Sequence, residues 1–225
     1  MLNSNDAREI RAAVSAAALD PKLATLRKEL SVFASNALSE VGTCLQEAGR
    51  GCDEVVAMSV LLKIGSQLVS ASADLLTEGR AYAGAALLRQ LVEVEYLAWA
   101  FDARDDDAQR WLRSDRNIRE EFFRPAKLRE AARGKFRGKD YSYHCELGGH
   151  PVPTGTLLLK DDPSTTQLLL SDLLGHAGGI WNHFVGWAKR NEDHTGQFRG
   201  LAYSMSKRFR EWQKSDPLVD LPPPP

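Results

Sequence analysis

The stretch GAALLRQLVEVEYLAWAF, residues 84–101, decides the fold. It is rich in good helix formers and apolar on nearly every side, and a helix of that kind belongs in a protein core. Arg89, Glu93 and Glu95 nevertheless lie within it, although charged residues are almost never fully buried unless they are paired or used. Arg89, Glu93 and Tyr96 stand at positions i, i+4 and i+7 and therefore share one face. This face predicts either a buried polar brace or one wall of a site, whereas Glu95 is expected to meet solvent or a basic partner.

Long helical segments flank this stretch on both sides. Apolar residues at spacings of three and four predict an amphipathic helix over 21–48, and the pattern resumes over 54–78 after a short Gly turn. Asp20-Pro21 and Asp162-Pro163 each place a capping acid before a proline, a pattern that opens helices. Further helices are expected over 80–103, 163–190 and 191–214. The sequence thus predicts an all-α fold, a multi-helix bundle of long antiparallel helices with an irregular loop between the central and C-terminal helices.

One domain is expected, with a short appendage at each end. Residues 21–214 are predicted to form a single helical-bundle domain. Residues 1–20 have few large apolar side chains and are interpreted as an N-terminal appendage. Residues 215–225 end in four prolines and are expected to be a disordered Pro-rich tail.

The composition excludes several classes of protein. Hydrophobic residues make up 43% and charged residues 26% of the 225 residues, which is ordinary globular usage. The net charge of -1 gives no support to a general nucleic-acid-binding surface, so no DNA partner is expected. The cysteines are odd in number and lack C-x-x-C spacing, which argues against a disulfide framework. A signal peptide and a membrane span are not expected either, and the predicted location is the cytoplasm.

The segment after the central helix is charged and broken by turn residues. The run 105–107 (Asp-Asp-Asp) suits the first turn of a fourth helix, which is expected to run to about Phe123 before Pro125 breaks it. The charge run from Arg104 to Arg137 is interpreted as a solvated helix face. Residues 134–166, rich in Gly, Pro, Tyr and His, are the least regular part, and loops of this length are often functional.

A second polar face lies on the penultimate helix. Asp172, His176 and His183 are separated by four and seven residues and share one side of that helix. Glycines in the same segment suggest close approach by another helix or by a ligand. A metal site would combine these residues with Glu93, but the Glu-x-x-His motifs of bundle-core di-iron sites are absent. The favoured interpretation is that Asp172 orients His176 and that both support packing, so neither a metal nor a cofactor is expected.

The irregular loop offers a third polar group. Its members are Tyr141, Tyr143, His144 and the pair His150-Pro151. A histidine on a loop between long helices can point into the mouth of a bundle and act as an acid, a base or a phosphate partner. It can equally cap a helix end by hydrogen bonding. A polar site at this place would join Arg89 and Glu93 to Tyr141 and His150.

The order of these motifs resembles a known family. An Arg-x-x-x-Glu helix (Arg89, Glu93), a charged segment with Trp, Phe and Pro, and a Tyr-Ser…His-Pro loop resemble a bacterial family of all-helical proteins of unknown function. That family is itself similar to the HEPN helical domains, many of which are metal-independent endoribonucleases or nucleotide-binding modules. The HEPN signature, an Arg followed after four to six residues by His, is matched by Arg137 and His144. The resemblance implies that the His assists attack by the RNA 2′-hydroxyl while the Arg steadies the phosphate, and His150, His144 and Arg137 are the catalytic candidates.

Two functions therefore stay open. The favoured one is a non-enzymatic interaction or regulatory protein, a homodimer, with a polar pocket near the bundle core. The ligand-binding candidates in that pocket are Arg89, Glu93, Tyr96, Tyr141, Asp172, His176 and His183. The alternative is a HEPN-like endoribonuclease or nucleotide-binding domain of a toxin or defence system, with RNA or a nucleotide as partner. Under the first hypothesis, loss of Arg89 or Glu93 is expected mainly to lower stability, because breaking a buried pair costs several kcal/mol.

Overall fold

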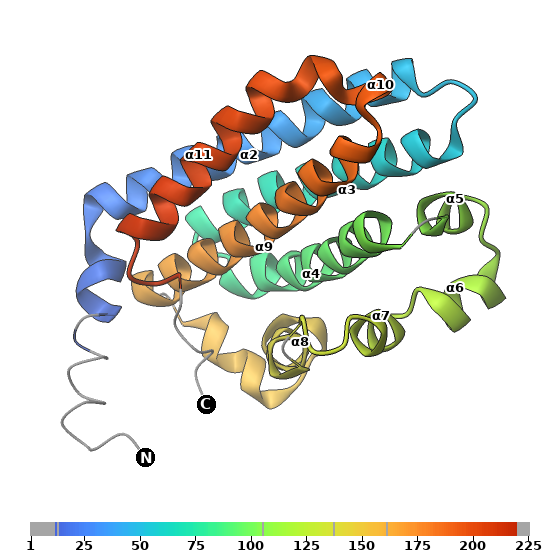
Figure 1. Cartoon of the computed structure of the whole chain (residues 1–225). Helices are drawn as coiled ribbons and strands as arrows, with labels where there is room; N and C mark the ends of the chain where they lie inside the picture. The colour runs from blue at the N-terminus through green and yellow to red at the C-terminus, as the bar shows by residue number, and fades with distance from the viewer. Residues whose placement is uncertain (1–11, 13, 105, 137, 161, 220–225) are drawn as a thin grey trace.

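The fold consists of helices throughout the part of the chain that the computed structural model describes, which is residues 12, 14–104, 106–136, 138–160 and 162–219. The prediction of an all-α multi-helix bundle is confirmed (Figure 1). The long helices are α2 (Pro21–Ala48), α3 (Asp53–Thr77), α4 (Ala81–Ala103), α9 (Pro163–Arg190) and α11 (Arg199–Ser215). The short α10 (Glu192–Thr195) and the 3₁₀ turn η3 (Gly196–Phe198) join the last two.

Helices α2 and α3 form the antiparallel hairpin that the Gly turn predicts. The Ser59 hydroxyl donates to the Gly42 carbonyl at 2.6 Å, and the Ser66 hydroxyl donates to the Ser35 carbonyl at 2.8 Å. Gly51 turns the chain between the two helices with φ +89°, a conformation that glycine adopts without strain. Buried hydroxyls near the turn and at the middle of the hairpin thus fix its register.

Helix α4, built from the opening stretch, packs against both α3 and α9 on one side and against the short helices of the crossover on the other (Figure 1). The Ser72 hydroxyl of α3 donates to the Gly84 carbonyl at 2.9 Å, so these antiparallel helices pack closely. Helices α4 and α9 run parallel, because Glu95 contacts His176 and Asp102, seven residues later, contacts His183. The long crossover over residues 104–162 returns the chain to the starting end and allows this parallel pairing.

The crossover contains short helices. Its elements are α5 (Asp107–Leu112), α6 (Arg116–Phe122), α7 (Pro125–Ala131), α8 (Gly138–His144), the π-helical turn η1 (Cys145–Gly149) and the 3₁₀ segment η2 (Pro153–Leu159). The single fourth helix expected up to Phe123 is in fact two helices, because the Asp115 side chain accepts from the Ile118 amide and starts a new one. The region expected to be an irregular loop likewise has helical turns, which dock on α4.

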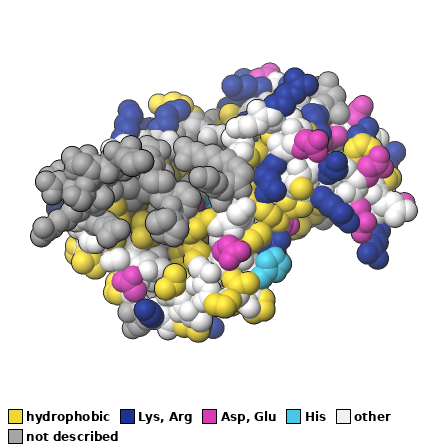
Figure 2. All heavy atoms as spheres, turned by 90° about the horizontal axis from the view of Figure 1, so that it is seen from below, with side chains coloured by type: hydrophobic (Ala, Val, Ile, Leu, Met, Phe, Trp, Pro, Cys, Tyr) yellow, Lys and Arg dark blue, Asp and Glu magenta, His cyan; other side chains and the backbone are white. Residues whose placement is uncertain are grey.

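Charged side chains of both signs intermix at the end of the molecule that α5, α6 and α7 form (Figure 2). Arg116 and Arg124 both pair with Glu120, and Lys127 pairs with Glu130. All these side chains are exposed. Such pairs contribute little stability but keep a helix face in solvent, in line with the interpretation of this charge run.

The two ends of the bundle domain are tied together by a buried ion pair. Arg27 of α2 bonds through Nε and Nη2 to the two carboxylate oxygens of Asp216, each at 2.7 Å. Neither side chain is exposed to solvent. Asp216 and Leu218 are buried, so the segment expected to be a disordered tail begins with residues packed on the bundle. Residues 1–11 and 220–225, which belong to the expected appendage and tail, lie outside the described residues.

Helix α3 is long and apolar enough to cross a membrane by length and composition alone. Of its most apolar window, 56% is buried inside the bundle, against α2, α4 and α9. A core helix of a soluble protein has the same composition and the same burial.

Candidate functional site

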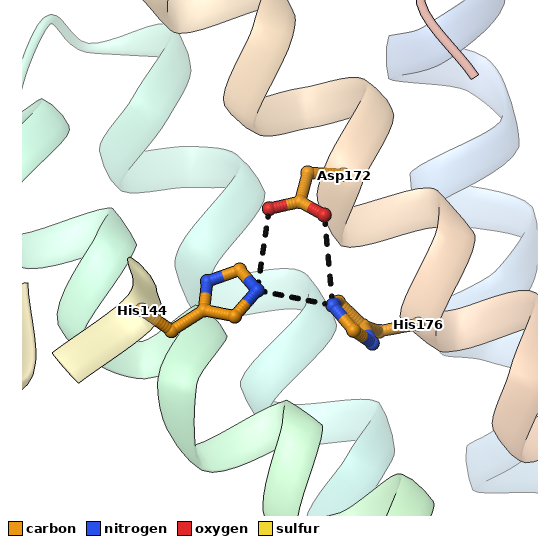
Figure 3. Close-up of side chains that lie close together, drawn as sticks. All are labelled: His144, Asp172 and His176. Atoms are coloured by element: carbon orange, nitrogen blue, oxygen red, sulfur yellow. Dashed lines mark hydrogen bonds and ion pairs between the residues drawn. The ribbon is translucent and has the colours of Figure 1, made fainter. Parts of the chain in front are cut away.

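Three polar side chains from two helices converge beside α4. His144 is the last residue of α8, while Asp172 and His176 stand one turn apart on α9 (Figure 3). The Nε2 atoms of His144 and His176 are 3.2 Å apart. The Asp172 carboxylate oxygens lie 3.6 Å from His144 Nε2 and 3.5 Å from His176 Nε2. The two contacts use different oxygens, Oδ2 toward His144 and Oδ1 toward His176. One ligand atom from each of the three side chains lies within 4.8 Å of the other two.

Glu95 of α4 fixes the orientation of His176. Its Oε2 is 2.6 Å from His176 Nδ1, a distance typical of a charge-assisted hydrogen bond. A proton on Nδ1 leaves the lone pair of Nε2 directed at His144 and Asp172. Gly179, one turn beyond His176, makes room for this carboxylate, since a Cβ there would lie 2.0 Å from Glu95 Oε1. The glycine that the sequence marked as a point of close approach thus accommodates an acid of α4.

The burial of the cluster controls its protonation. His144 is 3% exposed, and burial, with a smaller effect from His176, lowers the pKa of His144 to about 3. The imidazole is therefore neutral at physiological pH, with a lone pair free on one nitrogen. Burial and the nearby Asp172 charge raise the pKa of Tyr143, so its phenol also stays neutral. The converging atoms carry lone pairs, and one negative charge is on Asp172.

A cleft of about 240 Å³ opens onto this cluster from the solvent side. Its lining residues are Glu95, Tyr96, Lys135, Phe136, Asp172, Gly175 and His176. The aromatic wall is formed by Tyr96 and Phe136, whose ring centroids are 4.3 Å apart. The Asp172 side chain is 34% exposed, in contrast to 4% for that of His144. The cluster is thus closed on the side of α8 and accessible on the side of the cleft.

The same acid, histidine and glycine pattern recurs one heptad further along both helices. Asp102 Oδ2 lies 3.0 Å from His183 Nδ1, and a Cβ at Gly186 would lie 2.4 Å from Asp102 Oδ1. Arg190 completes this second group by pairing with Asp102 at 3.2 Å. Since the partner here is a cation and no further ligand-type side chain joins it among the described residues, the second group is an ion-pair brace.

The face predicted from Arg89 and Glu93 meets the crossover at Tyr141. Arg89 Nη2 donates to the Tyr141 hydroxyl at 2.9 Å, and that hydroxyl donates to Glu93 Oε1 at 3.0 Å. Burial alone would lower the pKa of Arg89, but hydrogen bonding to Cys145 and the charge of Glu93 raise it. The two charged side chains are 24% and 34% exposed, so this triad is a half-buried brace that docks α8 on α4.

The sequence-predicted candidates separate into distinct places. Tyr96 lies between the two groups, in ring contact with Tyr141 and on the wall of the cleft. His150 does not join Arg89 and Glu93, because its side chain is exposed. Its hydrogen bonds in the described structure are made by its backbone: the amide donates to the Cys145 carbonyl, and the carbonyl accepts from the Tyr82 hydroxyl at 3.2 Å. Arg137 lies outside the described residues.

The alternative metal grouping on the histidine face has different members in the structure. The metal-type grouping of Asp172 and His176 with His183 and Glu93 does not form, since the latter two have partners elsewhere. His144 takes their place, brought in by the crossover. Glu95 meets a basic partner, His176, as expected. The sequence holds a signal for this pairing, because two acids on α4 and two histidines on α9 are each seven residues apart.

Comparison of the chain with protein-family models, with curated proteins and with solved structures gave no match. The chemistry of the site therefore rests on its own atoms.

The geometry of the three ligand-type side chains suits a metal ion. A zinc-like ion holds nitrogen and oxygen ligands at about 2.0–2.2 Å, which in a tetrahedral arrangement places neighbouring ligand atoms roughly 3.3–3.6 Å apart. The two nitrogens are 3.2 Å apart, and each has a different Asp172 oxygen at 3.6 or 3.5 Å. With one ligand atom taken from each residue, all three lie within 4.8 Å of one another, so a small side-chain adjustment would bring them to ligand spacing. A single proton can bridge only one of these three pairs at a time, whereas a cation at their centre would satisfy all three.

Proposed function

We propose that this protein binds a divalent transition-metal ion on His144, Asp172 and His176, in a polar pocket near the core of its helical bundle. The observation that carries the proposal is the convergence of two imidazole nitrogens and one carboxylate, whose ligand atoms lie within 4.8 Å of one another. Two histidines with one carboxylate are a ligand set typical of zinc and of non-haem iron, whereas calcium and magnesium prefer oxygen ligands alone. Zinc or another first-row ion is therefore the expected occupant.

The surroundings of the cluster support the same assignment. Metal-bound histidines almost always donate their second N–H to a carboxylate or a carbonyl, and His176 does so to Glu95. The neutral form of His144 is the form that ligates. Three protein ligands leave one coordination position for water or another molecule, as in catalytic rather than structural zinc sites.

The experiment is zinc binding measured by calorimetry on metal-free protein, with His176→Gln as the test and His183→Gln as the matched control. Both histidines are on α9 and pair with an acid of α4, but only His176 faces further ligands. The wild type and His183→Gln should bind one equivalent of Zn²⁺, and His176→Gln should lose at least tenfold in affinity. Circular dichroism checks that each variant is folded. Absence of stoichiometric binding by the wild type, or equal affinity in the two variants, would overturn the proposal.

The wider role we propose is that of an interaction or regulatory protein that acts in the cytoplasm as a homodimer. In this role, binding of the ion controls the interaction, or the protein controls the availability of the ion. RNA cleavage, which the HEPN resemblance implies, stays a prediction. The burial of His144 against α9 does not favour it, because a base that acts on RNA must reach the ribose. Incubation of the purified protein with total RNA, with and without chelator, tests it directly.

A further inference from the structure

The position of the cleft indicates where the remaining coordination site of the ion would face. The buried His144 ligand approaches from the crossover, and Asp172 and His176 approach from α9 (Figure 3). The latter two side chains also form part of the cleft wall. An ion held by the three would therefore have protein on the side of α8 and the cleft on the other. A ligand supplied from solvent would reach the ion through this cleft.

The size of the cleft limits what can enter. At about 240 Å³ it is smaller than the roughly 300–1,000 Å³ of sites for drug-sized molecules. Gly175 stands at its edge, and a Cβ there would meet no atom within 4 Å. The cleft thus admits a molecule of few non-hydrogen atoms beside the ion, and a larger side chain at residue 175 would obstruct it without disturbing the packing.

The charges around the cleft favour an anion. Among the residues that line the cleft, a divalent ion and the Lys135 ammonium together exceed the charges of Asp172 and Glu95 by one. Lys135 is exposed and makes no ion pair with any described residue. Tyr96 and Phe136 form an apolar wall beside it, and a lower local dielectric strengthens attraction between opposite charges.

We infer that the open position of the ion takes a small oxyanion, a carboxylate or a phosphate, whose charge is met by Lys135. The inference rests on the proposed metal binding and names the class of ligand for that same site. The oxyanion binds the metal through one oxygen and lies against the aromatic wall. Oxygen anions are ordinary ligands of first-row ions, so no change in the protein ligands is required.

The test uses the Co²⁺-loaded protein, because the visible bands of Co²⁺ respond to a change of ligand. Acetate and inorganic phosphate are titrated separately. A saturable spectral change with either anion is expected. The anion that saturates at the lower concentration shows whether the site prefers a carboxylate or a phosphate. Lys135→Met should weaken anion binding by about two- to fivefold, the effect of losing one exposed charge partner. Lys127→Met is the matched control, since Lys127 is also exposed but pairs with Glu130 outside the cleft.

Gly175→Leu provides an independent readout. This variant should bind Co²⁺ as the wild type does and lose the response to anions, because the new side chain occupies the cleft and not the ligand triad. Spectra of Co²⁺-loaded protein that ignore both anions would overturn the inference while leaving the metal proposal intact. Failure to bind Co²⁺ at all would instead remove the proposed function. An equal anion response in Lys135→Met and Lys127→Met would also count against the inference.

Discussion

At the scale of single residues, the orientation of His176 in the site depends on Gly179 as well as on Glu95. Where two helices pack as closely as α4 and α9, a carboxylate between them needs space that a Cβ on the facing helix would fill. Gly179 leaves this space for Glu95, and Gly186 leaves it for Asp102. Each acid can then reach the histidine one turn earlier on α9. The glycines therefore position the histidines indirectly, by allowing the acid to approach.

Gly179→Ala should reduce zinc affinity by about 10–100-fold, the usual effect of losing a carboxylate that orients a metal-bound histidine. The new Cβ would displace the far end of the Glu95 side chain, which can move at little cost. The free energy of unfolding without metal should change by no more than about 1 kcal/mol, since alanine is the better helix former. Calorimetric zinc titration and urea unfolding measure both effects.

Gly186→Ala is the control, because it displaces Asp102 from His183 in the same way. Its zinc affinity should match that of the wild type. Equal losses of affinity in the two glycine variants would show that the effect comes from helix packing and not from the orientation of His176.

At the scale of elements, the crossover supplies what the long helices lack. The central pair α4 and α9 provides Glu95, Asp172 and His176, all on rigid helices. His144 comes from α8, which is held on α4 by the Tyr141 triad and continues into the π-helical turn η1. Gly148 of that turn has its Cα against the backbone of Ala85 and Ala86, since a Cβ there would lie 2.6 Å from the Ala86 nitrogen. An ion would thus link the crossover to the bundle.

Zinc binding should therefore slow amide hydrogen exchange in residues 141–147 more than elsewhere. Two ligands lie on α9, which is already buried in the bundle, whereas the crossover gains a new attachment at His144. Hydrogen exchange followed by mass spectrometry, with and without Zn²⁺, measures the change. Helix α2, which contributes no ligand, serves as the internal reference. Stoichiometric zinc binding with unchanged exchange over 141–147 would rule out His144 as a ligand.

The sequence predicts the elements far better than the site. Helical periodicity and the Asp-Pro caps locate the long helices, because those signals are local; Asp162 accepts from the Ser164 and Thr165 amides as expected. The site depends on which residue of the crossover reaches α9, and the order of residues along the chain carries no direct signal for that. The Arg89–Glu93 pair illustrates the same limit. Its side chains are 24% and 34% exposed, so the pair is only partly buried, and the expected loss of several kcal/mol on removing one partner stays a prediction.

At the scale of the whole molecule, the fully buried ion pair is Arg27 with Asp216. Asp216 accepts further hydrogen bonds from the Trp212 indole at 2.8 Å and the Leu218 amide at 3.1 Å. Arg27 also donates to the Ala17 carbonyl at 3.2 Å. The group thus joins the segment before α2 to the end of α11, and it closes the bundle at the end opposite the α2–α3 turn (Figure 1).

Asp216→Asn should lower the free energy of unfolding at neutral pH by about 3–5 kcal/mol, because it leaves the Arg27 guanidinium buried without a counter-charge. Glu211→Gln, which removes an exposed partner of Lys207, should cost no more than about 1 kcal/mol. Urea unfolding of both variants gives the comparison. A cost for Asp216→Asn as small as that of the control would mean that the pair does not close the bundle.

The same pair predicts how stability depends on pH. Burial alone would raise the pKa of Asp216, but hydrogen bonds from Arg27 and the Leu218 amide hold it below its ordinary value. A carboxyl with a lowered pKa in the folded state contributes stability that is fully present above the unfolded pKa of about 3.9 and is lost as the pH falls through the folded pKa. The difference in unfolding free energy between wild type and Asp216→Asn should therefore be constant from about pH 7 to pH 5 and shrink at lower pH. A difference that stayed constant in acid would place the stabilising charge on another group.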